Sequence, residues 1–321
     1  MVDSSRALVC KRTNYYGFTW AILLLGLAVW PLFMGPYVLH IAVLICLNIL
    51  IVNGLSIIER SGQLSFGHSA FVALGAYGSV LLSSTFGLGS ILASLLGIMV
   101  AALVALVLGA VILRLRGVYF VLVTFAFAEL TRLALLDWSD ITGGANGISA
   151  IPAFEVLGFA FDTRTSFYVL ALCVVVLSMI LIHQIFKHPL GEALTAVSKN
   201  AGLAESTGLN VYRLQLIAFV MGCALAALGG ALMARYIGFV SPESFNLSIS
   251  VALITMLVIG GRGSLWGPLI GAIVLTSLPE IFRGALQTQH IFYGVALILI
   301  IRFLPGGLVS IPSWFKKHKK V

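Results

Sequence analysis

Charged residues are scarce in this sequence of 321 residues. Asp, Glu, Lys and Arg make up 9% of it, whereas hydrophobic residues make up 60%. A soluble domain carries roughly 25% charged residues, so most of this surface must face lipid. The net charge of +8 does not indicate nucleic-acid binding, because the basic residues stand singly between apolar runs. We expect a membrane protein surrounded by a lipid bilayer, with no nucleic acid as a partner.

Motifs for chemistry are also missing. The four cysteines stand far apart, and neither a metal-ligand spacing nor a disulfide framework is present. The sequence lacks G-x-x-x-x-G-K-[ST], G-x-S-x-G and H-E-x-x-H. We therefore expect no catalytic residue, no metal and no cofactor bound by this chain. If it drives a solute uphill, another polypeptide or an ion gradient must supply the energy.

Long apolar runs dominate what is present. A helix needs about 20 residues to cross the hydrocarbon core, and ten runs approach that length. They are Phe18–Met34, Val38–Ile58, Gly67–Ser84, Ile91–Leu113, Val118–Leu136, Ser166–Phe186, Leu214–Ala234, Leu247–Gly260, Leu265–Phe282 and Ile291–Leu304. No small-residue cleavage site follows the first run, so we interpret it as an uncleaved helix rather than a signal peptide. We predict an all-α polytopic membrane protein with about ten transmembrane helices in a single domain, residues 1–321.

Lys and Arg set the predicted orientation. With both termini in the cytoplasm, fifteen of the 19 basic residues fall on the inner side, and the reversed topology inverts this ratio. The polar segment 188–213 is then cytoplasmic, and the long loop 137–165 lies outside.

Segment 188–213 is the longest mixed polar stretch of the second half. Pro189 marks a turn, Glu192–Ala204 is predicted as a short helix, and Gly208 is placed to end a second turn. Three apolar residues recur at i, i+3 and i+4 and predict an apolar stripe with polar flanks. The residues assigned to a docking surface are Gly191, Glu192, Ala193, Ala196, Val197, Lys199, Asn200 and Gly208. The alternative is a connector without a partner.

Two clusters inside the apolar runs are candidates for a translocation path. Segment 61–78 is rich in glycine and serine, which predicts an interrupted helix, and its candidate residues are Ser65, Gly67, His68 and Gly75. The alternative is that these glycines only let helices approach. Glu129 and Arg132 lie three apart on one helix face. They form either a selectivity site or an internal ion pair.

Glycines also mark a loop and two helix contacts. The outer loop contains Thr142, Gly143, Gly144, Asn146 and Gly147, whose glycines permit positive φ and predict a tight platform beside the translocation entrance; the alternative is a solvated turn. Small residues recur every four positions in two ladders, which predict close helix packing. The ladders are Gly222, Ala226, Gly230, Ala234 and Gly263, Gly267, Gly271.

Several blocks carry a family resemblance. SFGHSAFVALGAYG, ITGGANGISAIP, the stretch from HPLGEALTAVSKN to ALGGAL, and SPESFNLSISVALITMLVIGGRGSLWGPLIGA resemble permease subunits of bacterial branched-chain amino-acid ABC importers. The resemblance runs from about Asn53 to Pro305 and is closest to the LivM-type subunit. One departure is Glu192 and Thr195, where the family often has basic residues.

The resemblance implies an assembly in the bacterial cytoplasmic (inner) membrane. Its parts are a second permease subunit of LivH type forming a heterodimer, two cytoplasmic ATPase subunits that use ATP, and a periplasmic solute-binding protein. Segment 188–213 is then the ATPase-coupling loop. We predict an ABC importer permease for branched-chain amino acids. The alternatives are a urea or short-amide importer, an ion-coupled secondary transporter with Glu129 and Arg132 as relay, and a structural anchor.

Overall fold

The computed structural model describes residues 35–115, 117–156, 158–281, 294 and 307–310. Within them, seven helical stretches are long and apolar enough to cross a membrane, one of them formed by η3 and α11 together. The main helices are α2 (Pro36–Glu59), α3 (His68–Phe86), α4 (Ser90–Ile112), α5 (Val118–Asp137), α7 (Arg164–Lys187), α10 (Val211–Ile237) and α11 (Leu247–Gly260). The prediction of a helical polytopic membrane protein is confirmed.

The number of spans is only partly accounted for. An eighth apolar helix, α12 (Gly267–Ile281), is shorter than these seven stretches. The predicted spans Phe18–Met34 and Ile291–Leu304 lie outside the described residues. The total of ten therefore stays a prediction.

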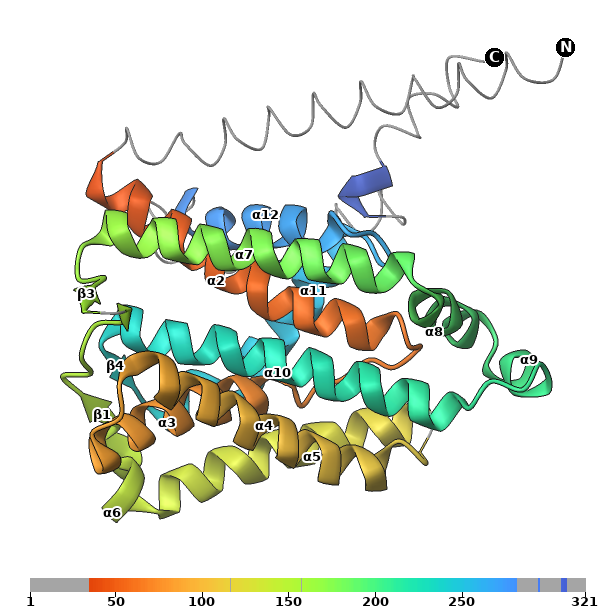
Figure 1. The fold of residues 1–321 in the computed structure, drawn as a ribbon, viewed down its shortest axis with the longest axis horizontal. Coiled ribbons are helices and arrows are strands. Elements are labelled where there is room, and N and C mark those ends of the chain that lie inside the picture. Colours follow the sequence, from red (N-terminus) through yellow and green to blue (C-terminus); the bar gives the residue numbers. More distant parts are fainter. Residues whose placement is uncertain (1–34, 116, 157, 282–293, 295–306, 311–321) are drawn as a thin grey trace, which may run out of the picture.

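Short helices and strands gather at the two ends of the helix bundle (Figure 1). What we call the loop end carries α6 (Ser139–Thr142), η2 (Gly144–Asn146), β1 (Ile148–Ser149), β2 (Glu155–Val156), β3 (Phe159–Ala160), β4 (Phe239–Val240) and η3 (Pro242–Phe245). The opposite end, the hairpin end, carries α8 (Pro189–Lys199) and α9 (Ala201–Ser206). A last short turn, η4 (Leu308–Ser310), closes the described residues.

The strands at the loop end join segments far apart in the chain. β1 pairs antiparallel with β4, with Ile148 opposite Val240. β2 and β3 form a separate hairpin in which Glu155 is opposite Ala160. The β1–β4 pair fastens the loop after α5 to the segment after α10.

Small residues build the centre of the bundle, where α10 packs along α2 and α3. A methyl group on Gly222 would overlap the carbonyl oxygen of Gly54 in α2, and one on Gly230 would overlap the carbonyl of Val72 in α3. Ala226 and Ala234 of the same ladder are buried. Close backbone approach of this kind is how helices associate in lipid, so the first predicted ladder is confirmed.

The second ladder is confirmed for two of its three members. A methyl group on Gly271 of α12 would overlap the Met256 carbonyl oxygen in α11, and one on Gly267 would overlap the Gly261 carbonyl oxygen just after α11. These two glycines therefore let α12 pack closely against α11. Gly263 has no atom near its Cβ position and has φ +70°. Gly263 therefore makes the turn between α11 and α12 rather than a helix contact, because only a residue without a side chain adopts this backbone cheaply.

Candidate functional site

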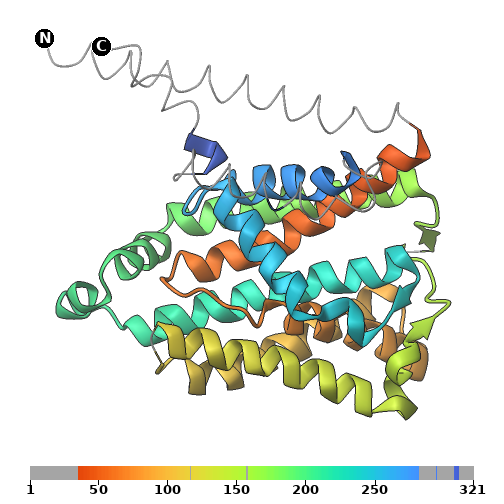
Figure 2. The same ribbon diagram turned by 180° about the vertical axis from the view of Figure 1, so that it is seen from behind.

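The chain between α2 and α3 is the interrupted segment, residues 60–67. It is non-helical, yet Ser61, Gln63, Ser65 and Gly67 are buried within the bundle. Figure 2 shows it turning back into the bundle from the end of α2. Irregular backbone at membrane depth survives only where protein or water covers its polar groups, and here protein covers it. Helix α3 itself runs unbroken from His68 to Phe86, so the predicted interruption of segment 61–78 is confined to the residues before His68 and does not break the span.

The candidates Ser65, Gly67 and His68 lie together where α3 begins. The Ser65 hydroxyl accepts a hydrogen bond from the Gly67 N–H at 3.3 Å. His68 is fully buried, and its Nε2 donates to the Ile51 carbonyl oxygen at 3.0 Å. A methyl group on Gly67 would lie 2.8 Å from the Thr124 carbonyl oxygen, so the segment rests against α5.

Gly75 makes a different contact from these three residues. A methyl group there would overlap the backbone of Ala227 in α10. The structure places Gly75 in the contact between α3 and α10, as the alternative reading of the glycines in segment 61–78 stated. It lines no open surface, because that contact buries it.

A charged triad of Glu129, Arg132 and Glu243 lies where α5 meets η3, towards the loop end. Arg132 Nε donates to both carboxylate oxygens of Glu129, at 3.1 and 3.2 Å, so the two residues form the ion pair expected from their spacing. Arg132 Nη1 also donates to Glu243 Oε1 of η3 at 2.7 Å. Sequence reasoning missed Glu243, which is 111 residues away along the chain. The only signal was a carboxylate between two apolar runs.

The hairpin of α8 and α9 differs from the predicted helix Glu192–Ala204. The helix begins at Pro189 and is broken at Asn200, whose backbone is extended. The Asn200 side chain accepts from the Leu203 N–H at 3.1 Å, because Asn competes well as a helix N-cap. Gly208 has φ +88° and ends α9, as predicted.

Packing of the hairpin also corrects the predicted stripe. Leu194 is fully buried against Ile57 and Ile182, and Val197 is buried with Ala204 and Val211. Val197 therefore does not share an exposed face with Ala196, because helical spacing turns it towards Leu194.

The exposed face of α8 is mostly polar. Glu192, Thr195, Ala196 and Lys199 are exposed, and Ala193 is half-buried. With Phe186 and Gly191, the four exposed residues line a hollow of about 350 Å³. Gly191 is buried against Phe186, whose backbone a Cβ there would overlap. This hollow is the surface that α8 presents at the hairpin end.

The hairpin touches the interrupted segment directly. A methyl group on Gly62 would lie 3.3 Å from Ser198 Cα of α8. Gln215 of α10 donates to the Ser61 carbonyl oxygen at 3.3 Å. The Arg60 guanidinium lies 4.1 Å from the ring centre of Phe186, at the end of α7. Contacts therefore run from α8 through residues 60–67 to α5.

The loop after α5 is ordered and uses its glycines as predicted. Gly143, Gly144 and Gly147 all have positive φ. The buried Thr142 hydroxyl donates to the Trp138 carbonyl oxygen at 2.8 Å and accepts from the Gly144 N–H at 3.2 Å. A methyl group on Gly147 would overlap the Val240 carbonyl of β4. Asn146 is exposed. The loop is packed against β4 and is not a solvated turn.

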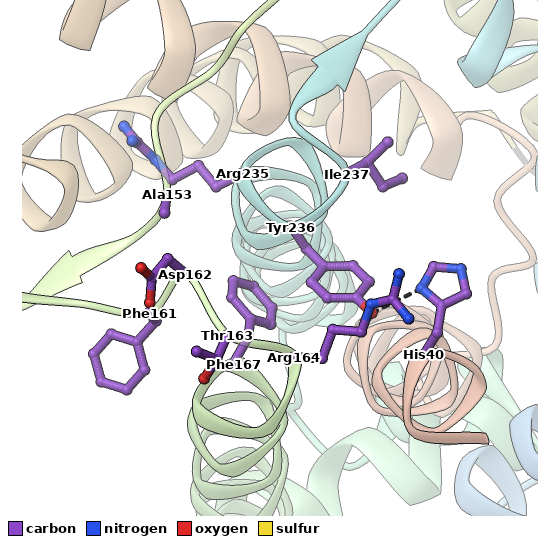
Figure 3. A pocket seen from close by; sticks show the side chains of 10 residues that line it. All are labelled: His40, Ala153, Phe161, Asp162, Thr163, Arg164, Phe167, Arg235, Tyr236 and Ile237. Carbon is purple, nitrogen blue, oxygen red and sulfur yellow. Dashed lines mark hydrogen bonds between the residues drawn. The ribbon is translucent and has the colours of Figure 1, made fainter. Parts of the chain in front are cut away.

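A cavity of about 330 Å³ opens at the loop end between α2, α7 and α10 (Figure 3). On one side His40 Nδ1 lies 2.7 Å from the Tyr236 hydroxyl, with the two rings stacked. Arg164 donates to the Pro36 carbonyl oxygen at 3.1 Å, and Asp162 lies across the cavity. Asp162 and Arg164 both line the cavity, and neither forms an ion pair with another described residue.

Buried Arg235 also lines this cavity, but its guanidinium points away towards α3 and α4. It donates to the Ser90 hydroxyl at 3.0 Å, to the Ser79 carbonyl oxygen at 3.4 Å and to the Pro152 carbonyl oxygen at 3.5 Å. One charged side chain thus ties α10, α3, α4 and the loop together, which is a structural role.

Comparisons with known proteins agree with this architecture. Residues 37–304 match the family described as branched-chain amino acid transport system / permease component. The chain is 34% identical to the high-affinity branched-chain amino acid transport system permease protein LivM of Escherichia coli (strain K12), over 91% of this chain and 74% of that protein. LivM of Salmonella typhimurium gives the same values.

Other comparisons are weaker. The LivH permease protein of Salmonella typhimurium is 28% identical over 39% of this chain and 41% of that protein. No solved structure matches the chain. A family match over most of the chain, joined to LivM identity along nearly its whole length, establishes the assignment: the chain belongs to the family of permease components of branched-chain amino acid transport systems, and it is of the LivM type.

Proposed function

We propose that this chain is the permease subunit of an ABC importer that moves branched-chain amino acids across the bacterial cytoplasmic membrane. Family membership and the names of the LivM and LivH relatives support this solute class. In this proposal a second permease subunit of LivH type completes the pore, two cytoplasmic ATPase subunits supply the energy, and a periplasmic protein delivers the solute. The chain itself hydrolyses no nucleotide.

The hairpin end faces the cytoplasm in this proposal, and the loop end faces outward. Basic residues support it, because more of them lie at the hairpin end. Those in the hairpin or beside helix ends next to it are Arg60, Arg114, Lys187, Lys199, Arg213 and Arg262, and those in the loop-end parts of α5, α7 and α10 are Arg132, Arg164 and Arg235. Both termini are then cytoplasmic.

The observation that carries the proposal is the contact between the hairpin and the interrupted segment. Ser198 of α8 touches Gly62, and the same segment reaches Thr124 of α5 through Gly67. The exposed face of α8 receives the ATPase at its hollow, with Glu192 and Lys199 for polar contacts and Ala196 at its centre. When ATP closes the ATPase dimer, the hairpin moves and shifts residues 60–67 against α5. The populations of outward- and inward-open states change accordingly.

The solute path follows the side of α5 that meets residues 60–67 and η3. Ser65, Gly67 and His68 are buried behind its wall at the centre, and Glu129 and Arg132 border it towards the loop end. The Ser69 and Ser250 hydroxyls, 2.8 Å apart, join α3 to α11 at its inner wall. Gly75 is left out of this path, because α10 covers it.

Uptake by the complete complex in proteoliposomes tests the function. We expect leucine to accumulate only with ATP and a separate ATPase chain, and to be unaffected when the proton and sodium gradients are collapsed. Uptake that persists without the ATPase and stops with a gradient would instead establish the ion-coupled transporter. ATP-dependent uptake of urea or a short amide, without uptake of leucine, would keep the importer and replace its solute.

A further inference from the structure

The charged triad of Glu129, Arg132 and Glu243 lies on a face that lipid cannot cover. Glu129 precedes the end of α5 at Asp137 by eight residues, about 12 Å along the helix. Charged groups at membrane depth are costly and face a bundle interior or a water-filled cavity. Yet 38% of the Glu129 side chain and 61% of the Glu243 side chain are exposed. In the working protein this face is therefore turned away from lipid, towards water or the second permease subunit.

The neighbouring chain is irregular, as a water-lined face requires. Glu243 belongs to η3, which with β4 replaces the outer part of a span whose regular helix, α11, has only 14 residues. At 1.5 Å per residue, 14 residues cover about 21 Å of a core about 30 Å thick. Non-helical backbone at this depth persists where it lines an aqueous cavity.

The charges of the triad do not balance. Two carboxylates share the single guanidinium of Arg132, so the triad carries a formal charge of −1. Glu129 is held by both Nε and Nη2, whereas in the part of the chain that the structure describes Glu243 is held only by Nη1, through Oε1. The second oxygen of Glu243 is therefore available on the exposed side to accept hydrogen bonds.

We propose that the triad is a recognition site for the ammonium group of the solute at the outer part of the path, with Glu243 as its contact residue. This inference rests on the proposed function and adds to it the residue that recognises the ammonium group: deaminated analogues, which carry only a negative charge, are repelled there. Arg132 orients both carboxylates and keeps one of them neutralised. Carboxylates are the usual partners of ammonium groups in such charge-assisted hydrogen bonds.

The first test uses leucine uptake by the reconstituted complex. Glu243→Gln should raise the KM for leucine about tenfold with little change in the maximal rate, and Glu243→Asp should restore much of the affinity. Asp140→Asn is the matched control, since Asp140 is an exposed carboxylate at the same end. A lowered maximal rate at unchanged KM, or an unchanged KM, overturns the ammonium site while leaving the importer intact.

The second test needs no solute and so separates the two proposals. A cysteine replaces the exposed Ser248, in the first turn of α11, in the full complex freed of native cysteines. A cationic methanethiosulfonate should react faster than an anionic one, and Glu243→Gln should lower that rate ratio severalfold, because it removes a unit negative charge near the reacting thiol. No reaction with either reagent, or an unchanged ratio, refutes the inference even if leucine proves not to be the solute.

Discussion

Replacing Leu194 by alanine tests whether the hairpin of α8 and α9, proposed to bind the ATPase, must also be firmly packed to transmit the ATPase's movement. Leu194 is fully buried in a small cluster with Ile57, Ile182 and Ala218. A buried Leu→Ala change costs about 2–5 kcal/mol, depending on how far the site collapses. Because the cluster joins α8 to α2, α7 and α10, we expect this loss to favour local opening of the hairpin by about 30-fold or more. The exposed face of α8 stays unchanged.

The assay follows three quantities in the assembled complex. Hydrogen exchange of the α8 amides should accelerate, the ATPase should still co-purify, and the amount of leucine moved per ATP hydrolysed should fall severalfold. Leu203→Ala is the matched control, because 64% of this α9 residue is exposed. Ala196→Trp should give the opposite pattern: normal exchange in α8 but no bound ATPase, since Ala196 lines the hollow on the exposed face.

One result would refute this reasoning. If Leu194→Ala accelerates exchange in α8 but leaves the transport per ATP unchanged, a firmly packed hairpin is not needed for coupling. If Ala196→Trp still binds the ATPase and couples, while the same enlargement at exposed Thr165 of the loop end is also harmless, α8 is a connector without a partner.

Three further predictions concern the rest of the chain. Gly230→Val should destabilise the fold by several kcal/mol, measured as loss of detergent-stable complex, because its side chain would overlap the Val72 backbone; normal thermal stability would contradict the packing of α10 on α3. Gly144→Val should impair uptake without disassembling the complex, since Gly144 has φ +54° and its Cβ would lie 3.1 Å from Ser139 Cβ; full transport would leave the loop without a role in it. Cysteines at Ser149 and Ser313, in a background free of native cysteines, should react with an impermeant reagent from opposite sides of the membrane. Labelling of both from the same side would show that the predicted number of spans between them is wrong by an odd number.

Periodicity and composition sufficed for features that depend on local sequence. Long apolar runs predict membrane helices because each crossing must satisfy its own backbone hydrogen bonds. The irregular backbone near Ser65 and the positive φ of Gly143 were also predictable locally, since serine and glycine affect the backbone conformation at their own positions. The Glu129–Arg132 pair also needed only helical spacing.

Tertiary structure decided what depends on residues distant along the chain. Glu243 joins Arg132 only because β1 pairs with β4 and brings η3 to α5. Val197 turns inward because α10 and α9 supply its partners, Val211 and Ala204. No sequence pattern marks such contacts, since they arise from the packing of whole helices. The sequence by itself therefore determined a helical membrane permease with a polar hairpin between two spans, whereas only the fold decided which face of that hairpin is free and which charges meet beside α5.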